Sequence, residues 1–433
     1  MLRMRRDPLG LFSEAARECP ELARLDLVVF RAYLINSPSL VKQVLQDNRE
    51  NYPLGSVYEK LRPIFGNSVS MSEGKEWAAQ RRLLQPAFAH GRLAGFAGIM
   101  AAEATGMARA WREGGAARSG LEMTREMMKL TLSIVVRAMF SSGVKDDLVG
   151  RIGDATAVLN EDMNRRFYSL VDIPLFIPTP RNLRFRRALG ALEELVYGLI
   201  RGRRQDPEPP PDLLSMLLEA RYEDTGEGMT ERQVRDEIMT IFGAGHETTA
   251  SVLAWLWFSL SSRPQVEALL HAEVDRVLGG REPGLADIPA LPYTRMVIEE
   301  TMRLYPPAWS FLRTARADDR MGDYRVRAGS LIFLCPYTMH RDARFWADPE
   351  VFDPGRFAPE RQADLPRFAY FPFGGGPRGC IGQNFAMMEM VLVVAALARR
   401  FRFRLAPGHP VELEPLVTLR ARHGIRMTLE ERA

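Results

Sequence analysis

A glycine-rich segment around one cysteine, residues 373–382, contains the residue types that point most directly to chemistry. It reads Phe-Gly-Gly-Gly-Pro-Arg-Gly-Cys-Ile-Gly, with the cysteine at position 380. Three consecutive glycines weaken any helix or strand, so we expect a loop whose small residues let the backbone approach something flat or bulky. Arg378 precedes Cys380 and a helix is expected soon after it; positive charge and helix N–H groups both favour a thiolate. A thiolate shielded by glycine backbone is a good soft ligand for iron.

Two other interpretations of this loop stay open on these residues alone. A glycine-rich loop before a helix can bind phosphate. However, no Lys-Ser or Lys-Thr pair follows, and the preceding run, residues 368–373, is aromatic and contains Pro372. Cys380 could also be a buried, unreactive cysteine, which is the usual fate of a single cysteine.

A second candidate segment, residues 244–249 (Ala-Gly-His-Glu-Thr-Thr), falls in the middle of a long predicted helix. Gly and paired Thr are poor residues for a helix interior, and Thr hydroxyls can bond to the carbonyl one turn back. We therefore expect a local opening of the helix, of a kind that recurs at functional sites. Considered singly, Glu247 would be a solvated or paired acid and Thr248 a carbonyl-bonded hydroxyl. His246 has no second histidine one turn away, so we do not expect it to bind a metal.

Two pairs of residues at helical spacing complete the candidates. Glu300 and Arg303 share one helix face, where the simplest interpretation is a surface ion pair worth a few tenths of a kcal/mol. Trp77 and Arg81 place an indole N–H and a guanidinium one turn apart. The alternative for Arg81 is a solvated face, since Arg82 is adjacent.

The cysteine loop resembles the cysteine-ligand loop of the cytochrome P450 superfamily. The match is Phe373-x-x-Gly376-x-Arg378-x-Cys380-x-Gly382, in which five residues must fall in register. The resemblance implies that Cys380 is the proximal iron ligand of a haem b, that Phe373 packs near the sulfur, and that Arg378 pairs with a haem propionate. In this superfamily the thiolate pushes electron density onto the iron and favours O–O cleavage.

Residues 244–249 resemble the oxygen-binding groove of the same superfamily. In that interpretation Ala244 and Gly245 leave room over the iron for dioxygen and substrate. Glu247 and Thr248 would form an acid–alcohol pair that delivers protons through ordered water, a form of general acid catalysis. Because both members of the pair are present, we expect oxygen activation that is competent for hydroxylation.

The remaining motifs also follow the family order. Glu300-Thr-Met-Arg303 resembles the Glu-x-x-Arg motif, and residues 352–357 resemble the segment that supplies a second arginine, Arg356. These three side chains would form a buried structural network that fixes the chain ahead of the cysteine loop, a role for which Lys would not replace Arg. The resemblance further implies four ligands for the haem propionates: Trp77, Arg81, Arg313 and Arg378.

Substrate contacts are expected from a few segments of the chain. By resemblance these are the loop after Tyr58, residues 308–311 and the turn near residues 416–419. Within them Trp309 and Phe311, with Ala244 on the long helix, would make the pocket apolar. A bulky aromatic residue at such a position is more often part of the core than a ligand contact.

Helical periodicity positions these motifs. We expect a strand pair at residues 25–35, a helix from Ser37-Pro38 to about residue 46, and mainly helix from 75 to 278. Thr230 and Gln233 form a possible capping box that starts the long helix, and the proline-rich residues 206–211 form a loop. Further helices are expected at 265–278, 293–304 and 384–400, with short strands at 324–335. The predicted fold is mainly α with a small β component: one P450 domain over 1–433, helical at about 75–305 and 384–400, with β-rich parts near 25–36, 308–340 and 405–430.

Composition narrows the class of protein. The 433 residues are 46% hydrophobic and 26% charged, with a formal charge of +4 (58 basic, 54 acidic), which indicates a globular protein and no nucleic-acid binding. Three cysteines, Cys19, Cys335 and Cys380, argue against a disulfide framework and for a reducing compartment. The N-terminus lacks the apolar stretch of a signal peptide, and the longest nearly apolar run, residues 250–260, is too short to span a bilayer. We expect a soluble, cytoplasmic, monomeric protein without a membrane anchor.

The expected reaction is hydroxylation or epoxidation of a hydrophobic small molecule with O2. About fifty residues follow Cys380, which leaves no room for a fused reductase, so electrons from NAD(P)H would come through a separate ferredoxin and ferredoxin reductase. Lys75, Arg81 and Arg82 could supply part of the docking patch. Two alternatives stay open: a peroxygenase driven by hydrogen peroxide, and a non-catalytic haem-thiolate sensor or carrier. A terpene, fatty acid, polyketide or steroid would each fit an apolar pocket.

Overall fold

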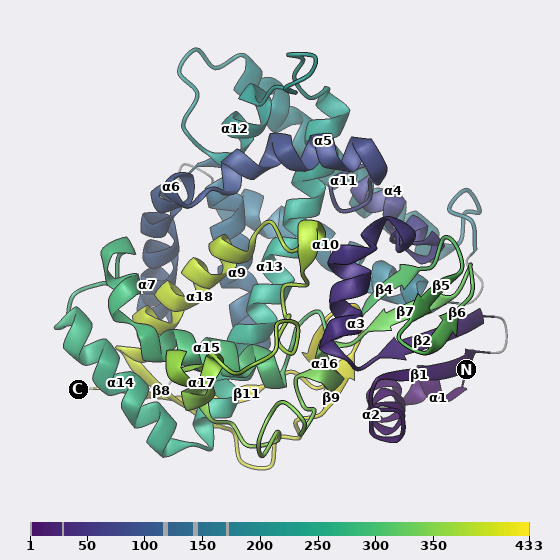
Figure 1. Ribbon diagram of the computed structural model, residues 1–433. Coiled ribbons are helices and arrows are strands. Elements are labelled where there is room, and N and C mark those ends of the chain that lie inside the picture. The colour runs from purple at the N-terminus through teal and green to yellow at the C-terminus, as the bar shows by residue number, and fades with distance from the viewer. Residues whose placement is uncertain (1, 28–29, 116–119, 142–145, 170–172, 433) are drawn as a thin grey trace.

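Helices make up most of the molecule (Figure 1). The computed structural model describes residues 2–27, 30–115, 120–141, 146–169 and 173–432. The helices are α1 (Leu2–Arg6), α2 (Pro8–Glu18), α3 (Pro38–Lys42), α4 (Arg62–Phe65), α5 (Gly74–Leu84), α6 (His90–Leu93), α7 (Ala97–Glu113), α9 (Met123–Phe140), α10 (Asp146–Tyr168), α11 (Pro180–Arg204), α12 (Leu213–Glu219), α13 (Glu231–Ser261), α14 (Pro264–Leu278), α15 (Pro292–Leu304), α16 (Pro336–Met339), α17 (Pro359–Gln362) and α18 (Gln383–Ala398).

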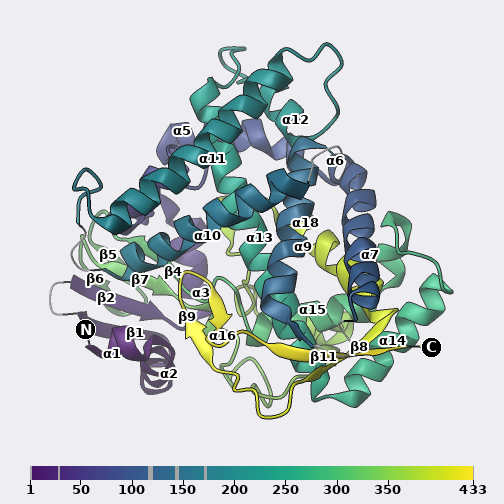
Figure 2. The ribbon, with the colours of Figure 1, turned by 180° about the vertical axis from the view of Figure 1, so that it is seen from behind.

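Short strands form small sheets beside and below the helices (Figures 1 and 2). They are β1 (Leu22–Leu27), β2 (Phe30–Ile35), β3 (Leu121–Glu122), β4 (Phe311–Thr314), β5 (Asp319–Met321), β6 (Tyr324–Val326), β7 (Leu331–Leu334), β8 (Phe401–Leu405), β9 (Leu413–Pro415), β10 (Leu419–Ala421) and β11 (Arg426–Glu431). The largest sheet has the order β1-β2-β7-β4, in which β2 and β7 run parallel and the other pairs antiparallel. This sheet therefore joins the N-terminal strands to the segment that begins at Phe311. The C-terminal strands form the pairs β8–β11 and β9–β10, and β3 joins the edge of β11.

Helix α13 runs through the middle of the helical part, and both views show it there (Figures 1 and 2). It begins at the predicted capping box, in which Thr230 and Gln233 bond to each other's backbone N–H. With 31 residues it is about 46 Å long. It packs against α9, α15 and α18. A helix of this length can line a site at its middle while both of its ends are anchored in the core.

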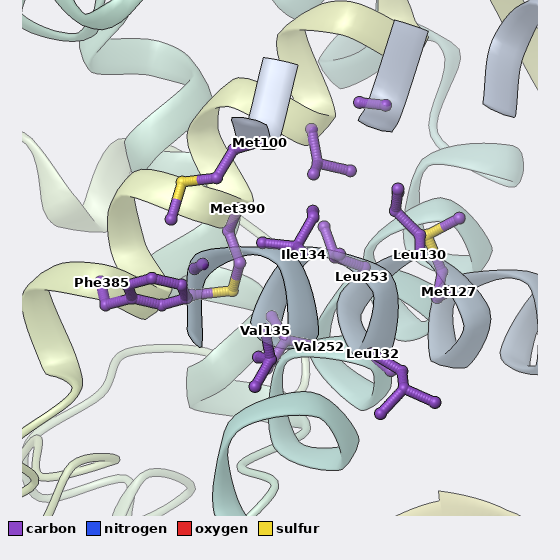
Figure 3. Packing of buried hydrophobic residues seen from close by; sticks show 14 of the residues in the cluster. Met100, Met127, Leu130, Leu132, Ile134, Val135, Val252, Leu253, Phe385 and Met390 are labelled. Atoms are coloured by element: carbon purple, nitrogen blue, oxygen red, sulfur yellow. The ribbon is translucent and has the colours of Figure 1, made fainter. Parts of the chain in front are cut away.

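The core that holds α13 is built from side chains of four helices. Large apolar residues of α7, α9, α13 and α18 meet between the helix axes (Figure 3). Members labelled in the figure are Met100, Met127, Leu130, Leu132, Ile134, Val135, Val252, Leu253, Phe385 and Met390. Helix α18 starts directly after the cysteine loop, so this packing also fixes the end of that loop.

Most elements agree with their predicted bounds. The strand pair, the loop at residues 206–211 and the helices α13, α14, α15 and α18 are confirmed. The predicted helix at 37–46 is α-helical only to Lys42 and continues as a π-helical turn, η1 (Gln43–Asp47). The mainly α fold with a small β component is confirmed. Among the described residues, no helix combines the length and the apolar character needed to cross a bilayer.

Candidate functional site

The cysteine loop is compact because its glycines allow contacts that no side chain would. Gly376 has a φ of +64°, and a Cβ there would lie 2.0 Å from the carbonyl oxygen of Leu45 in η1. A Cβ on Gly375 would lie 2.2 Å from the ring of Phe368. The close approach predicted from the glycines is therefore made to η1 and to an aromatic ring, and it fixes the loop against the β-rich part of the molecule.

Cys380 is held with its sulfur facing open space. Its backbone N–H donates to the carbonyl oxygen of Phe373 at 2.9 Å, which closes the turn. The side chain is accessible from the large cavity described below and is otherwise enclosed by protein. Burial raises the pKa of the Cys380 thiol, while the N–H of Gly382 and the charge of Arg81 act in the opposite direction. Desolvation is the largest of these effects and favours the neutral thiol, while the Gly382 N–H and the Arg81 charge each stabilise the thiolate.

A cavity of about 340 Å³ lies between the cysteine loop and the middle of α13. Its walls are mostly apolar. They come from α13, the loop, the start of α18 and the segment leading into β4. The apolar lining includes Leu45, Phe88, Val135, Leu213, Ile241, Val252, Pro307, Ala308, Phe311, Phe373, Ile381, Phe385 and Met390.

On the α13 side, Ala244, Gly245 and Thr248 line this cavity opposite Cys380. A Cβ on Gly245 would lie 3.2 Å from Val135, so a larger residue would push on α9. The Thr248 hydroxyl donates to the Ala244 carbonyl at 2.7 Å. The expected local opening is wrong for this structure, because α13 is helical throughout. The hydroxyl bonds of the kind predicted are present, yet they satisfy the carbonyls without interrupting the helix.

Glu247 does not line the cavity with Thr248. Successive helix residues diverge by about 100°, and the Glu247 side chain is buried on another face of α13. Its carboxylate accepts hydrogen bonds from Asn160 at 2.7 Å, from Arg420 at 2.9 Å and from Thr418. The expected acid–alcohol pair is therefore not in direct contact, and the acid is held by α10 and by the C-terminal pair β9–β10.

No local sequence pattern predicts Asn160, Thr418 and Arg420 as partners of Glu247. Asn160 precedes Glu247 by 87 residues, and Arg420 follows it by 173. A small cavity of about 50 Å³ borders Glu247, Ser251 and Arg420 on this side of the helix. His246, the other polar neighbour, is buried, with its Nδ1 within hydrogen-bond distance of the Phe242 carbonyl.

Three arginines gather at the rim of the cavity beside the cysteine loop. Arg313 and Arg378 line the cavity, and the Arg378 guanidinium lies 4.5 Å from the centre of the Trp77 ring. Burial lowers the pKa of Arg378 to about 10, and repulsion from Arg313 and Arg81 adds to this effect. Among the described residues, none of the three arginines is in an ion pair with a carboxylate. Such a cluster of half-buried cations is suited to a ligand that carries carboxylates of its own.

The expected substrate contacts are only partly found at the cavity. Phe311 and Ala244 line it. Trp309 is a correction: it is 4% exposed, packs against Phe12 and donates its indole N–H to the Leu416 carbonyl at 2.8 Å. It is not among the described residues of the cavity wall, because its ring is part of the core between the largest sheet and α2.

The ion-pair set ahead of the loop is fully buried. Arg303 and Glu300 are both 0% exposed, and Arg303 donates to the two carboxylate oxygens at 2.6 and 2.8 Å. Arg356 approaches the same carboxylate at 3.5 Å. Arg303 also donates to the carbonyls of His340, Pro349 and Val351. The structure thus brings together the three residues expected to fix this segment, and the simpler interpretation of Glu300–Arg303 as a surface pair is wrong.

Comparisons with known proteins agree with this geometry. The family model described as cytochrome P450 matches residues 1–424. Cyclooctatin synthase of Streptomyces melanosporofaciens is 38% identical over 421 residues, which cover 97% of this chain and 91% of that protein. Pentalenene oxygenase of Streptomyces avermitilis is 32% identical, over 99% of this chain and 94% of that protein. Among solved structures, the haem domain of cytochrome P450DA superposes with a TM-score of 0.88 at 26% identity, covering 98% of this chain and 93% of that one.

Proposed function

The chain belongs to the cytochrome P450 family, and from that membership we propose that it inserts one atom of O2 into a cyclic terpenoid. As a member of this haem-thiolate family it is an oxidoreductase that uses haem and O2. The observation that carries the finer proposal is that Cys380 and Thr248 face one cavity whose other walls are mostly apolar away from Arg313 and Arg378.

The residues at the cavity fit a haem. Cys380 would be the iron ligand, with Gly382 supplying an N–H toward the sulfur and Phe373 packing beside it. Trp77, Arg81, Arg313 and Arg378 would hold the two propionates, since the guanidinium cluster has no carboxylate partner among the described residues. When bound, the haem supplies the site for binding and reducing dioxygen.

Two side chains of α13 would handle protons. Thr248 faces the cavity and can pass a proton from its Oγ1 once that hydroxyl leaves the Ala244 carbonyl. Glu247 is the nearest acid along the chain. Because its carboxylate is bound by Asn160, Thr418 and Arg420, it would reach Thr248 only by breaking these bonds or through ordered water.

The apolar wall and the relatives support a terpenoid substrate. The names of three relatives, cyclooctatin synthase, cyclooctat-9-en-7-ol 5-monooxygenase and pentalenene oxygenase, include two that state an oxygenase activity. Among the described residues that line the cavity, the charged ones are Arg313 and Arg378, which the haem propionates would occupy. A fatty acid would leave its carboxylate without a partner there, so a neutral polycyclic substrate is favoured.

A separate ferredoxin and its reductase would supply electrons from NAD(P)H. Lys75 and Arg82 are exposed on α5, the helix that also carries Trp77 and Arg81. Arg82 is within 3.6 Å of Glu223, an exposed pair that water and salt screen readily. An acidic partner could compete for this arginine. We expect a reducing, cytoplasmic location because the chain has only three cysteines.

The proposed function is tested by turnover with a defined library. Purified haem protein is titrated with cyclic terpenes, fatty acids, polyketides and steroids, and loss of iron-bound water is followed from the Soret band. Ligands that bind are then incubated with NADPH, ferredoxin, reductase and 18O2. Products of a terpene that gain one labelled oxygen are expected. Turnover confined to fatty acids, or turnover at the same rate with hydrogen peroxide alone, would overturn the proposal.

A further inference from the structure

A cluster of three hydroxyl groups reaches the cavity wall at Thr240. Thr240, on α13, lines the cavity and donates from Oγ1 to Ser68 Oγ at 2.6 Å. Ser70 Oγ lies 2.9 Å from Ser68 Oγ and 3.3 Å from Thr240 Oγ1. Ser68 is buried, Thr240 is partly exposed and Ser70 is exposed, so the cluster runs from the core to open space.

The cluster is held rigidly by α13. The backbone N–H groups of Asn67 and Val69 donate to the carboxylates of Asp236 and Glu237, both at 2.9 Å. These two acids lie one turn before Thr240, so the serine loop and the threonine have one common support. A hydrogen-bonding site built in advance in this way loses little entropy when a ligand binds.

The chemistry of the cluster leaves room for one more partner. Three hydroxyls bonded in a ring use one donor and one acceptor position each, and every oxygen keeps a second lone pair. The other threonines on the described cavity wall, Thr248 and Thr249, bond to carbonyls of their own helix. Arg313 and Arg378 lie on the cysteine side. Thr248 and Thr249 can also accept, but they lie near the middle of α13 opposite Cys380, whereas Thr240 lies about two turns away. Thr240 is therefore the hydroxyl on the described cavity wall that can accept from the far end of a ligand.

We propose that Thr240, positioned by Ser68 and Ser70, binds an oxygen function already present on the substrate, so that the enzyme oxidises a cyclic terpene alcohol rather than a hydrocarbon. Thr240 precedes Thr248 by eight residues, or about 12 Å along the helix. The bound hydroxyl would thus lie at the opposite end of the substrate from the carbon that is oxidised. The reaction that supplies this substrate must be an earlier hydroxylation, or a cyclisation that ends in capture of water. This inference rests on the proposed function and narrows its substrate class.

The test compares matched ligands that differ by one hydroxyl. The probes are cedrol with cedrane, and kauran-16-ol with kaurane, each titrated by the Soret shift against the wild type and three variants. Thr240→Val removes the hydroxyl at nearly constant volume, and Thr240→Ser keeps it. Ile241→Val is the control, since Ile241 lines the same wall without a polar atom.

The wild type is expected to bind the alcohol of at least one pair about three- to tenfold more tightly than its hydrocarbon, as one hydrogen bond allows. Thr240→Val should remove this preference, Thr240→Ser should keep it, and Ile241→Val should shift both affinities equally. An equal affinity for both members in the wild type, or an undiminished preference in Thr240→Val, overturns the proposal.

Two further outcomes keep the test decisive. If Thr240→Val does not retain haem, Ser70→Ala is used instead, because Ser70 is exposed and its loss disturbs no packing; its preference should fall at least twofold. A wild type whose spectrum responds to none of the four probes but does respond to fatty acids would reject the terpenoid proposal itself. Equal affinities for the hydrocarbons and the alcohols would reject the hydroxyl-binding site but leave the terpenoid proposal standing.

Discussion

Thr248 is the side chain whose removal should separate oxygen use from product formation. Its Oγ1 faces the cavity on the α13 side, opposite Cys380, and carries a proton that it can donate there. Thr248→Ala is expected to keep its haem but to release hydrogen peroxide, with product per NADPH falling at least severalfold. Thr248→Ser should recover most of the coupling. Oxygen electrode and peroxide assays measure this, and normal coupling in Thr248→Ala would remove Thr248 from the mechanism.

Glu237 should make stability depend on pH. Burial raises its pKa to about 8, against about 4.3 in an unfolded chain. The folded state therefore holds this proton more tightly, and the stability it contributes is lost as the pH rises from below the unfolded value through 8. Glu237→Gln removes the charge and should be more stable than the wild type by a few kcal/mol at pH 8.5, with no gain at pH 4.

Urea unfolding at several pH values measures this difference. The two proteins should have similar stabilities near pH 4, and the difference should grow as the pH rises toward about 8 and level off above it. Curves that stay parallel across the range would show that the Glu237 proton does not contribute.

The orientation of the Glu247 side chain could not be predicted from the residues near it in the sequence. The resemblance of residues 244–249 to the oxygen-binding groove implied an acid beside an alcohol, and both lie on the expected helix. The direction of the acid, however, depends on Asn160 and Arg420, which come from α10 and β10. A contact over such a sequence separation leaves no periodic pattern, so the chain alone could not predict it.

Arg420 can be tested through its pair with Glu247. Arg420→Met leaves a buried carboxylate without its cation and should cost about 1–3 kcal/mol of unfolding free energy, below the range for a fully buried pair because Arg420 is 26% exposed. Adding Glu247→Gln should recover part of this loss, since the stranded charge is then removed. A double variant as unstable as the sum of the single variants would mean that the two side chains do not interact.

At the scale of elements, the chain ahead of the cysteine loop depends on α15. Arg303 donates to a carboxylate and to three carbonyls of the segment after α16. Lysine has one nitrogen and cannot make this set of bonds. Arg303→Lys is therefore expected to lower the unfolding free energy by about 3 kcal/mol or more and to weaken haem retention.

The matched control for Arg303→Lys lies on the same helix. Arg295 pairs with Glu299 at 3.2 Å, and its side chain is 63% exposed. Arg295→Lys should change stability by less than about 0.5 kcal/mol. Urea unfolding with the haem Soret band as a second probe measures both variants. Equal stabilities for the two would contradict the structural role of the buried set.

Elements were predicted well where local signals are strong. The capping box at Thr230 and the proline-rich loop at residues 206–211 each act over a few residues, and their bounds agree closely with the structure. The opening of α13 was predicted wrongly, because low helix propensity at Gly245 and Thr249 is outweighed by packing against α9. Tertiary packing also explains why Trp309 does not line the cavity. Its ring packs against Phe12, and its indole N–H donates to the Leu416 carbonyl.

At the scale of the whole molecule, electron delivery should depend on charge. Lys75→Glu and Arg82→Glu are expected to slow reduction by an acidic ferredoxin severalfold at low salt, and much less at high salt, because salt screens exposed charges. Arg151→Glu, an exposed site on α10, is the control and should have little effect. Stopped-flow reduction in the presence of carbon monoxide measures the rates. Unchanged rates at low salt would discard α5 as the docking surface.

The account as a whole depends on the bond between the Cys380 sulfur and the haem iron. The most direct measurement is the absorption spectrum of the ferrous carbonyl complex, recorded for the wild type and for Cys380→Ser. The wild type should show the red-shifted Soret band of thiolate coordination, and the serine variant should lack it. A wild type that purifies without haem despite ample supply, or whose carbonyl complex has an unshifted band, would contradict the assignment of this cysteine.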